Sequence, residues 1–161
     1  MSRATVDILS DTEVLIRRTF DAERELVFEA ITSPEHVPHW YGCDTLKMIE
    51  CTIDLRVGGK WRYVLRTPDG GQHAFSGEYR EIVPPSRLVS TESYEPIGPG
   101  HEMVATVTLE AKNGRTLFRN HLQYKSKADR DGHLGAGMEK GMQEAFDRLD
   151  ALVTERSARR A

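Results

Sequence analysis

The last long segment of the chain limits the possible fold more than any other stretch. Its apolar side chains recur at spacings of three and four residues, as on one face of an α-helix. They are Leu134, Met138, Met142, Ala145, Phe146, Leu149, Leu152 and Val153. A helix over Asp129–Val153 would be roughly 37 Å long at 1.5 Å per residue. Because only one face is apolar, such a helix needs a broad apolar surface to pack against.

The preceding residues predict an antiparallel sheet that supplies this surface. Strand-like runs cover 13–20, 45–56, 61–66, 75–79, 87–94, 103–110 and 118–124, several with clear apolar–polar alternation. Gly58-Gly59, Pro68–Gly71 and Asn113-Gly114 are typical of tight turns between such strands. Consecutive hairpins favour an antiparallel sheet with one covered face. Two short helices are expected after the first strand, over about Ala22–Thr32 and from Pro34.

The chain is expected to form one α+β domain over 1–161. At 161 residues it has room for a single core. Residues 1–12 are expected to be loose or to add an edge segment, and residues 155–161 to be loose. The early glycines leave two alternatives for the last helix: it begins near Asp129, or it begins near Ala136 after a glycine-containing loop.

Composition argues against several classes of partner. The net charge is −3 with both signs interspersed, so no nucleic-acid partner is expected. No apolar run approaches the roughly 20 residues that span a bilayer. The first 13 residues lack the apolar core of a signal peptide, and the two cysteines, Cys43 and Cys51, form no CxxC pair. These features favour the reducing cytoplasm.

The sequence predicts no metal, no cofactor and no catalytic residue. His36 and His39 are three apart, but no third ligand follows them. Glu78 and Glu81 have opposite phases on one strand, so they do not form a facing carboxylate pair. No GxSxG, P-loop or GxGxxG motif is present.

Short motifs along nearly the whole chain carry a resemblance to a known family. They are Phe20-Asp21-Ala22 before Val27-Phe28 and Ala30, His39–Gly42, Asp54–Trp61, Gly77-Glu78-Tyr79 with Glu81–Pro85, and Gly137-Met138-Glu139 with Gly141 and Asp147-Arg148-Leu149. In this order they resemble the family named after the activator of Hsp90 ATPase, in the START-like, or helix-grip, superfamily. His133 departs from the family pattern, which usually has a small or apolar residue there.

The resemblance implies a helix-grip fold: a curved seven-stranded antiparallel sheet wrapped around a long C-terminal helix, with a cavity between them. It implies no shared catalytic residue. By strand and helix phase, the residues expected to line the cavity are Trp40, Trp61, Tyr63, Phe75, Tyr79, Met103, Phe118, Asn120, Met138, Gly141 and Met142. Trp40 and Tyr41 are interpreted first as a hydrophobic plug that closes one end of the sheet, and alternatively as a lid that lines the entrance.

The polar tips among the inward residues favour a cavity over a dry core. Tyr63, Tyr79, Asn120 and Tyr124 all have inward phase. In a dry core each unmet polar group would cost roughly 1–3 kcal/mol, whereas water or a ligand can satisfy it. Met138 and Met142 would give such a cavity an adaptable apolar wall.

Three functions follow, and the first is preferred. The protein binds a small apolar or amphipathic ligand without catalysis, as a monomer or homodimer. Alternatively it is a polyketide cyclase or aromatase, with Tyr63, Tyr79, Asn120 and His133 as candidates for proton transfer. The third is a co-chaperone that activates an Hsp90-type ATPase, which the family name invites.

Overall fold

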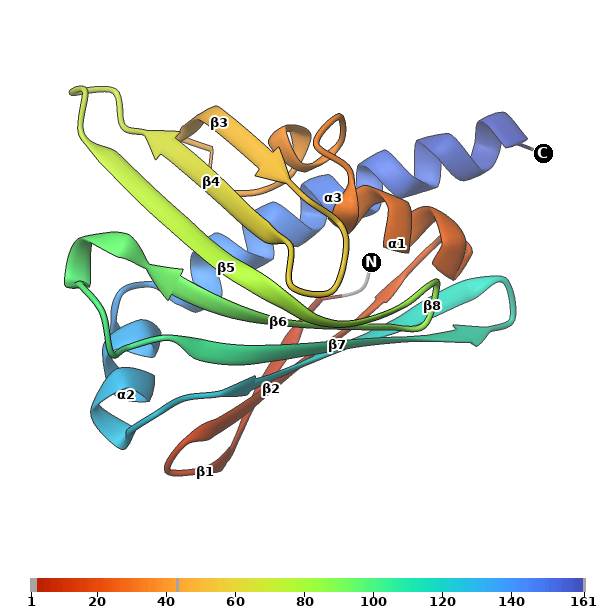
Figure 1. Cartoon of the computed structure of the whole chain (residues 1–161). Helices are drawn as coiled ribbons and strands as arrows, with labels where there is room; N and C mark the ends of the chain where they lie inside the picture. Colours follow the sequence, from red (N-terminus) through yellow and green to blue (C-terminus); the bar gives the residue numbers. More distant parts are fainter. Residues whose placement is uncertain (1–2, 43, 161) are drawn as a thin grey trace.

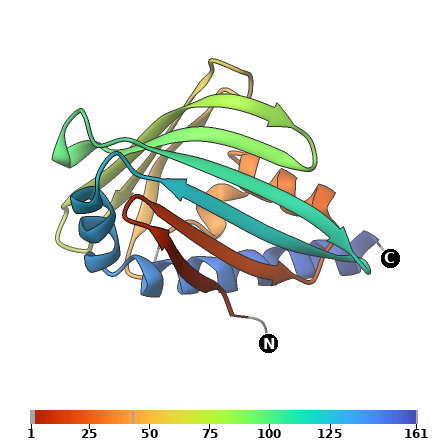
Figure 2. The same cartoon turned by 90° about the horizontal axis from the view of Figure 1, so that it is seen from below.

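The computed structural model describes residues 3–42 and 44–160. It shows an α+β fold in which one curved antiparallel sheet of eight strands carries a long C-terminal helix on its concave side (Figure 1). The strand order is β1-β2-β8-β7-β6-β5-β4-β3 (Figure 2). Strands that follow one another in the sequence are therefore neighbours in the sheet, except that β2 lies beside β8 and not beside β3.

The elements follow the turn and breaker residues of the sequence. The strands are β1 (Thr5–Ser10), β2 (Glu13–Phe20), β3 (Lys47–Ile53), β4 (Lys60–Arg66), β5 (Gln72–Val83), β6 (Arg87–Tyr94), β7 (Met103–Lys112) and β8 (Arg115–Gln123). The helices are α1 (Arg24–Thr32), α2 (Lys127–Gly135) and α3 (Met138–Arg160), with single 3₁₀ turns η1 (Val37–His39) and η2 (Glu95–Ile97). Asn113 and Gly114 both have positive φ, which a tight hairpin turn requires.

The sheet has eight strands, so the expected seven is wrong. The extra strand is β1, which pairs with β2 through Val6 opposite Ile16. The N-terminal residues thus form the added edge segment rather than a loose end. Val6 packs against the core, and Asp7 pairs with Arg17 at 2.8 Å across the two strands. A polar stretch with only a few apolar residues can still extend a sheet when its partner strand offers free backbone groups.

The C-terminal segment forms two helices, α2 and α3, instead of one helix that begins near Asp129 or near Ala136. Ser126 caps α2 by accepting a hydrogen bond from the Asp129 amide at 3.1 Å. Gly137 has a φ of +82°, a conformation that ends a helix and that glycine adopts without strain. The chain then restarts as α3, which continues to Arg160, so residues 155–160 are helical rather than loose. Residue 161 lies outside the described part of the chain.

The first helix also begins later than expected. It starts at Arg24 with Glu23 at the cap position, and no side chain caps it. Asp21, which precedes the helix, pairs with Arg115 at 2.9 Å. Ser33 holds the following turn, because its carbonyl accepts bonds from the amides of His36 and Val37. The second helix is therefore only the 3₁₀ turn at Val37–His39.

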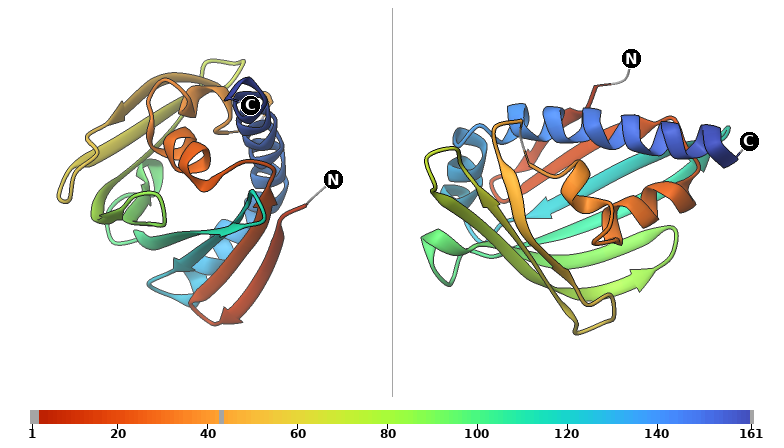
Figure 3. Two further views of the ribbon diagram at one scale, coloured as in Figure 1. Left: turned by 90° about the vertical axis from the view of Figure 1, so that its right-hand side faces the viewer. Right: turned by 90° about the horizontal axis from the view of Figure 1, so that it is seen from above.

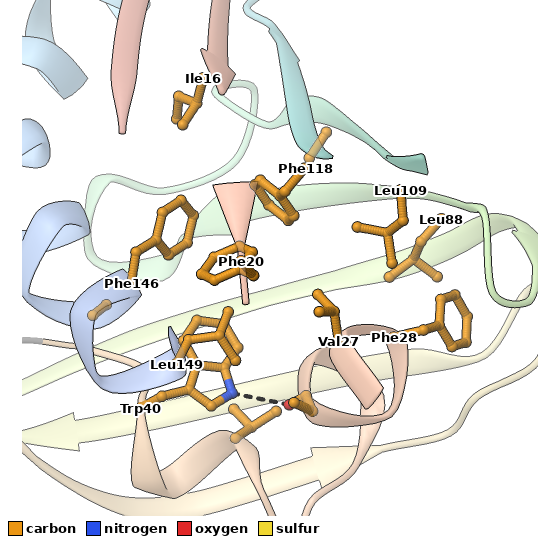
Figure 4. Close-up of a cluster of buried hydrophobic side chains, with 14 of the residues drawn as sticks. Ile16, Phe20, Val27, Phe28, Trp40, Leu88, Leu109, Phe118, Phe146 and Leu149 are labelled. Atoms are coloured by element: carbon orange, nitrogen blue, oxygen red, sulfur yellow. Dashed lines mark hydrogen bonds between the residues drawn. The ribbon is translucent and has the colours of Figure 1, made fainter. Parts of the chain in front are cut away.

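The core forms one continuous cluster between the sheet and the helices, and its phenylalanines gather at one end, called here the packed end. Phe20 from β2, Phe118 from β8 and Phe146 from α3 meet edge to face, with ring centroids 5.1–5.7 Å apart (Figure 4). Val27 and Phe28 of α1 point into the same cluster. Burying each of these side chains contributes roughly 1.5–3 kcal/mol before entropy.

The sheet curls around α1 and α3, so its concave face has two ends (Figure 3). At one end, α1 and the phenylalanines pack tightly. At the other end lies α2, where the inward side chains of β4 to β8 are more polar. The register places these inward positions in rows across the sheet, which is how distant residues meet.

Arg18 is the buried charge of the packed end. Its side chain is 1% exposed, and its guanidinium pairs with Asp147 at 2.8 Å and Asp150 at 3.6 Å on α3. The same guanidinium lies 5.3 Å from the centre of the Phe20 ring. Arg18 therefore joins β2 to the long helix.

Replacing Arg18 is expected to destabilise the fold, whereas replacing its neighbour is not. Arg18→Ala should lower the free energy of unfolding by about 2–4 kcal/mol, because it removes a buried ion pair and its packing. Arg17→Ala should change it by less than about 1 kcal/mol, because the Arg17–Asp7 pair is exposed. Urea denaturation of both variants measures this. Equal losses would contradict the assigned role.

Candidate functional site

The candidate site lies on the concave face at the end nearer α2. Glu92 on β6 pairs in register with Met103 on β7, and Val104 pairs with Gln123, which places Tyr124 next in the same row. On the other side of Glu92, Trp61 of β4 pairs with Gly77 of β5. Residues from five separate segments therefore meet in one row.

Glu92 is the unusual residue of this row. It is partly buried, and within the described residues its carboxyl group has no hydrogen bond or ion pair. Removal from bulk water raises the pKa of Glu92 from 4.5 to about 7. Burial raises the pKa of the three surrounding phenols of Tyr41, Tyr63 and Tyr124, and the negative charge of Glu92 adds to this increase. The carboxyl group thus sits among tyrosines rather than beside a cation.

The wall around Glu92 is aromatic. Tyr41, which follows η1, lies 4.8 Å from the Tyr63 ring and 6.0 Å from the Phe75 ring, measured between centroids. Trp61 lies 4.7 Å from Tyr63. Tyr41 and Phe75 keep part of their surface accessible although both pack against the core. Inward aromatic residues that remain partly accessible are typical of a binding surface rather than of a closed core.

Tyr124 and His133 form the polar group at the α2 end. The Tyr124 hydroxyl lies 2.5 Å from Nδ1 of His133, which α2 brings over the end of β8. Burial lowers the pKa of His133, so the imidazole is neutral at pH 7. Its Nδ1 atom can then accept a hydrogen bond from the Tyr124 hydroxyl. Burial also raises the pKa of Tyr124. The histidine that departs from the family pattern thus has a defined partner.

Two further inward groups have no protein partner. Asn120 Oδ1 and Trp61 Nε1 are fully buried, and neither makes a hydrogen bond within the described residues. A buried polar atom left unpaired costs roughly 1–3 kcal/mol. Such atoms are commonly satisfied by water or by a bound molecule.

Nine of the eleven predicted cavity residues belong to the hydrophobic core or pack against it, and the other two are Asn120 and Gly141. Trp40, Trp61, Tyr63, Tyr79, Met103 and Phe118 are buried, whereas Phe75, Asn120, Met138, Gly141 and Met142 are partly buried. Two of them belong to the packed end. Trp40 donates its indole hydrogen to the Ala30 carbonyl at 2.9 Å (Figure 4), and Phe118 lies in the phenylalanine cluster.

Sequence reasoning missed Glu92, and it interpreted Tyr41, together with Trp40, as a plug or a lid rather than as a cavity residue. Alternation over Arg87–Tyr94 could have found Glu92, since Leu88, Ser90 and Glu92 share a phase and Leu88 is buried. A charged residue on a buried phase is a stronger signal than another apolar one. Tyr41 follows an irregular turn, where strand periodicity gives no orientation.

Other charged groups lie outside the concave face. On the outer face of the sheet, Arg62 pairs with Glu50 and Glu95 at 3.0 Å, beside a groove of about 510 Å³. His121 faces outward and contacts Glu13 at 2.9 Å, and Asp54 pairs with Arg56 at the surface at 2.8 Å. Within residues 3–42 and 44–160, no group of three or more histidines, cysteines or acids could hold a metal ion.

Comparison with known proteins places the chain in a family. Residues 21–154 match the model described as activator of Hsp90 ATPase homolog 1-like protein. The chain belongs to this family. No curated protein sequence matches it significantly.

Solved structures share the fold over almost the whole chain. A crystal structure of a Rhodobacter sphaeroides protein has 29% identity and a TM-score of 0.89, covering 95% of this chain and 99% of that one. A solution structure of an Arthrobacter aurescens protein has 26% identity and a TM-score of 0.82, covering 94% and 91%. An AHSA1-like protein from Aeromonas hydrophila has 19% identity and a TM-score of 0.72, covering 87% and 93%, which shows the fold alone. Among the described residues of this chain, no helix is long and apolar enough to cross a membrane.

The raised pKa of Glu92 predicts a pH-dependent cost in stability. Between pH 4.5 and 7 the folded protein binds more protons at Glu92 than the unfolded chain does, so the free energy of unfolding falls as pH rises. Glu92→Gln removes this cost. The variant should be more stable than wild type by roughly 2–3 kcal/mol at pH 8 and equal to it at pH 4.

Thermal unfolding at both pH values measures the difference. Glu78→Gln is the matched control, since Glu78 lies on the neighbouring strand and lines the outer groove instead. A gain for Glu92→Gln of the same size at pH 4 and pH 8 would contradict the assigned burial of the carboxyl group.

Proposed function

We propose that this protein binds a small amphipathic molecule on the concave face, between the sheet and α3, and that it does so without catalysis. The single observation that carries the proposal is Glu92: a desolvated carboxyl group, free of protein partners in the described chain, inside an aromatic wall. A fold that needed only a packed core would gain stability from an apolar residue there.

The helix side of the site supports the same proposal. Met138 and Met142 of α3 pack against the core but remain partly accessible. A Cβ atom added at Gly141 would meet no atom within 4 Å, so close packing does not require a glycine there. Methionine side chains adapt to ligands of varied shape. The apolar part of a ligand would lie against this face of α3.

Filling this space should reduce binding. Met142→Trp should weaken the binding of a fluorescent fatty-acyl probe at least about tenfold, because the larger side chain occupies the same volume. Ala151→Trp, on the exposed face of α3, should leave the affinity unchanged. Fluorescence titration measures both, and circular dichroism checks the fold. Absence of any probe binding to the wild type would refute the proposal.

An enzymatic function of the cyclase or aromatase type is the second candidate. The observation that favours it is the pairing of Tyr124 with His133 near a carboxyl group whose pKa is about 7. A general acid or base works best when its pKa lies near the working pH. Among the proton-transfer candidates proposed from the sequence, His133 faces Tyr124. The structure adds Glu92 to these candidates.

Turnover separates the two functions. If the protein cyclises a linear poly-β-ketone, Glu92→Gln and Tyr124→Phe should each lower the rate by about 100-fold, the usual contribution of a positioned proton-transfer group. Product formation can be followed by chromatography. If the probe binds but no product forms above the uncatalysed rate, the enzymatic function is excluded and the non-catalytic binding function stands. The co-chaperone hypothesis rests on the family description alone, whereas both functions above also rest on groups inside the sheet.

A further inference from the structure

The charge near Glu92 is entirely negative or neutral. The titratable groups on which its charge acts are Tyr41 after η1, Tyr63 of β4 and Tyr124 after β8. Beyond them lie Cys51 of β3 and Tyr79 of β5, which act on Tyr63, and His133 of α2, which faces Tyr124. The phenols and the thiol are uncharged at pH 7, and burial keeps their pKa values above the ordinary range. His133 is neutral for the reason given above.

The buried arginines do not supply a counter-charge. Arg130 of α2 lies close enough to influence Tyr124, but its guanidinium is held by Asp131 at 2.8 Å and by the Ser10 carbonyl at 2.8 Å. Arg18 is held by Asp147 and Asp150 at the packed end. Among the described residues, no cation contributes to the pKa of Glu92. An anionic ligand would therefore meet repulsion and no counter-charge.

The groups beside Glu92 suit a positive ligand. The faces of aromatic rings carry partial negative charge and attract organic cations. Tyr41 and Tyr63 lie 4.8 Å apart between centroids, and the Glu92 charge acts on both phenols. A carboxylate among aromatic rings is the combination that binds substituted ammonium groups in proteins.

We propose that the ligand is a hydrophobic amine, bound as the ammonium ion. The ammonium group donates a hydrogen bond to the Glu92 carboxylate and contacts the Tyr41 and Tyr63 rings. The hydrocarbon part runs along Met138 and Met142 of α3. This inference rests on the proposed binding function and adds the chemical class of the ligand.

Three probes with the same ten-carbon chain test the inference: decylamine, decanol and decanoate. Calorimetry at pH 8 should give an affinity for decylamine at least about tenfold higher than for decanol, since a charge-assisted hydrogen bond exceeds a neutral one by about that factor. Decanoate should bind most weakly. Glu92→Gln should remove the preference for the amine, and the Glu78→Gln control should keep it.

A pH series on the wild type tests the same assignment without any substitution. A primary alkylamine has a pKa of about 10, so decylamine stays charged between pH 5 and 8. Its affinity should fall as pH decreases through about 7, where Glu92 takes up a proton. The affinity for decanol should stay constant over the same range.

The outcomes separate this inference from the proposed function. Equal affinity for all three probes, or a preference for decanoate, overturns the amine assignment and leaves ligand binding in place. A preference for the amine that persists in Glu92→Gln also overturns the assignment, since a group other than Glu92 would then recognise the ammonium charge. If none of the three probes binds, the amine assignment and the proposed function both fail.

Discussion

The packing of α3 against the concave side of the sheet determines the rest of this structure. Phe146 and Leu149 of the helix meet Phe20 and Phe118 there, and α1 closes the cluster from the side. Met138 and Met142, nearer the start of the helix, also pack against this core. The inner surface of the sheet changes in character along the helix, from phenylalanines in close contact to tyrosines, an asparagine and a glutamate.

This division explains how the fold tolerates Glu92. Placing a carboxyl group in a fully packed core would cost several kcal/mol unless it were paired. Glu92 itself is only partly buried, although Tyr63, Met103 and Tyr124 beside it are buried, so the cost is limited and its pKa stays near neutrality. The fold thus keeps its stability in one region and its unusual chemistry in another, which is common in binding proteins of one domain.

Much of the fold could be predicted from periodicity. The alternation of Met103, Ala105, Val107 and Leu109 and the Asn113-Gly114 turn gave the correct strands, register and inner face. Two features could not be predicted. The pairing of β1 depends on the free edge of β2 rather than on its own composition, and the helix break depends on the φ of one glycine among several, Gly137. The family likeness also favoured seven strands over eight.

The site was less predictable than the fold. Strand phase correctly placed Tyr63, Tyr79 and Asn120 on the inner side. It could not say which inward residues belong to the packed end, as Phe118 does, because that depends on where α1 and α3 lie. It also could not pair Tyr124 with His133, since their contact requires the turn between β8 and α2.

The added strand has a consequence for how this molecule behaves at high concentration. β2 would otherwise end the sheet with a row of free backbone groups eight residues long, open to pairing with another chain. β1 covers that row with a strand of six residues, whose register shifts between Ile8 and Ser10 and which carries the acidic Asp7. A short, irregular and charged margin is a poor template for further strands. The N-terminal segment thus replaces a long, regular edge by a short, irregular one, on which Ile8 and Leu9 are exposed apolar side chains.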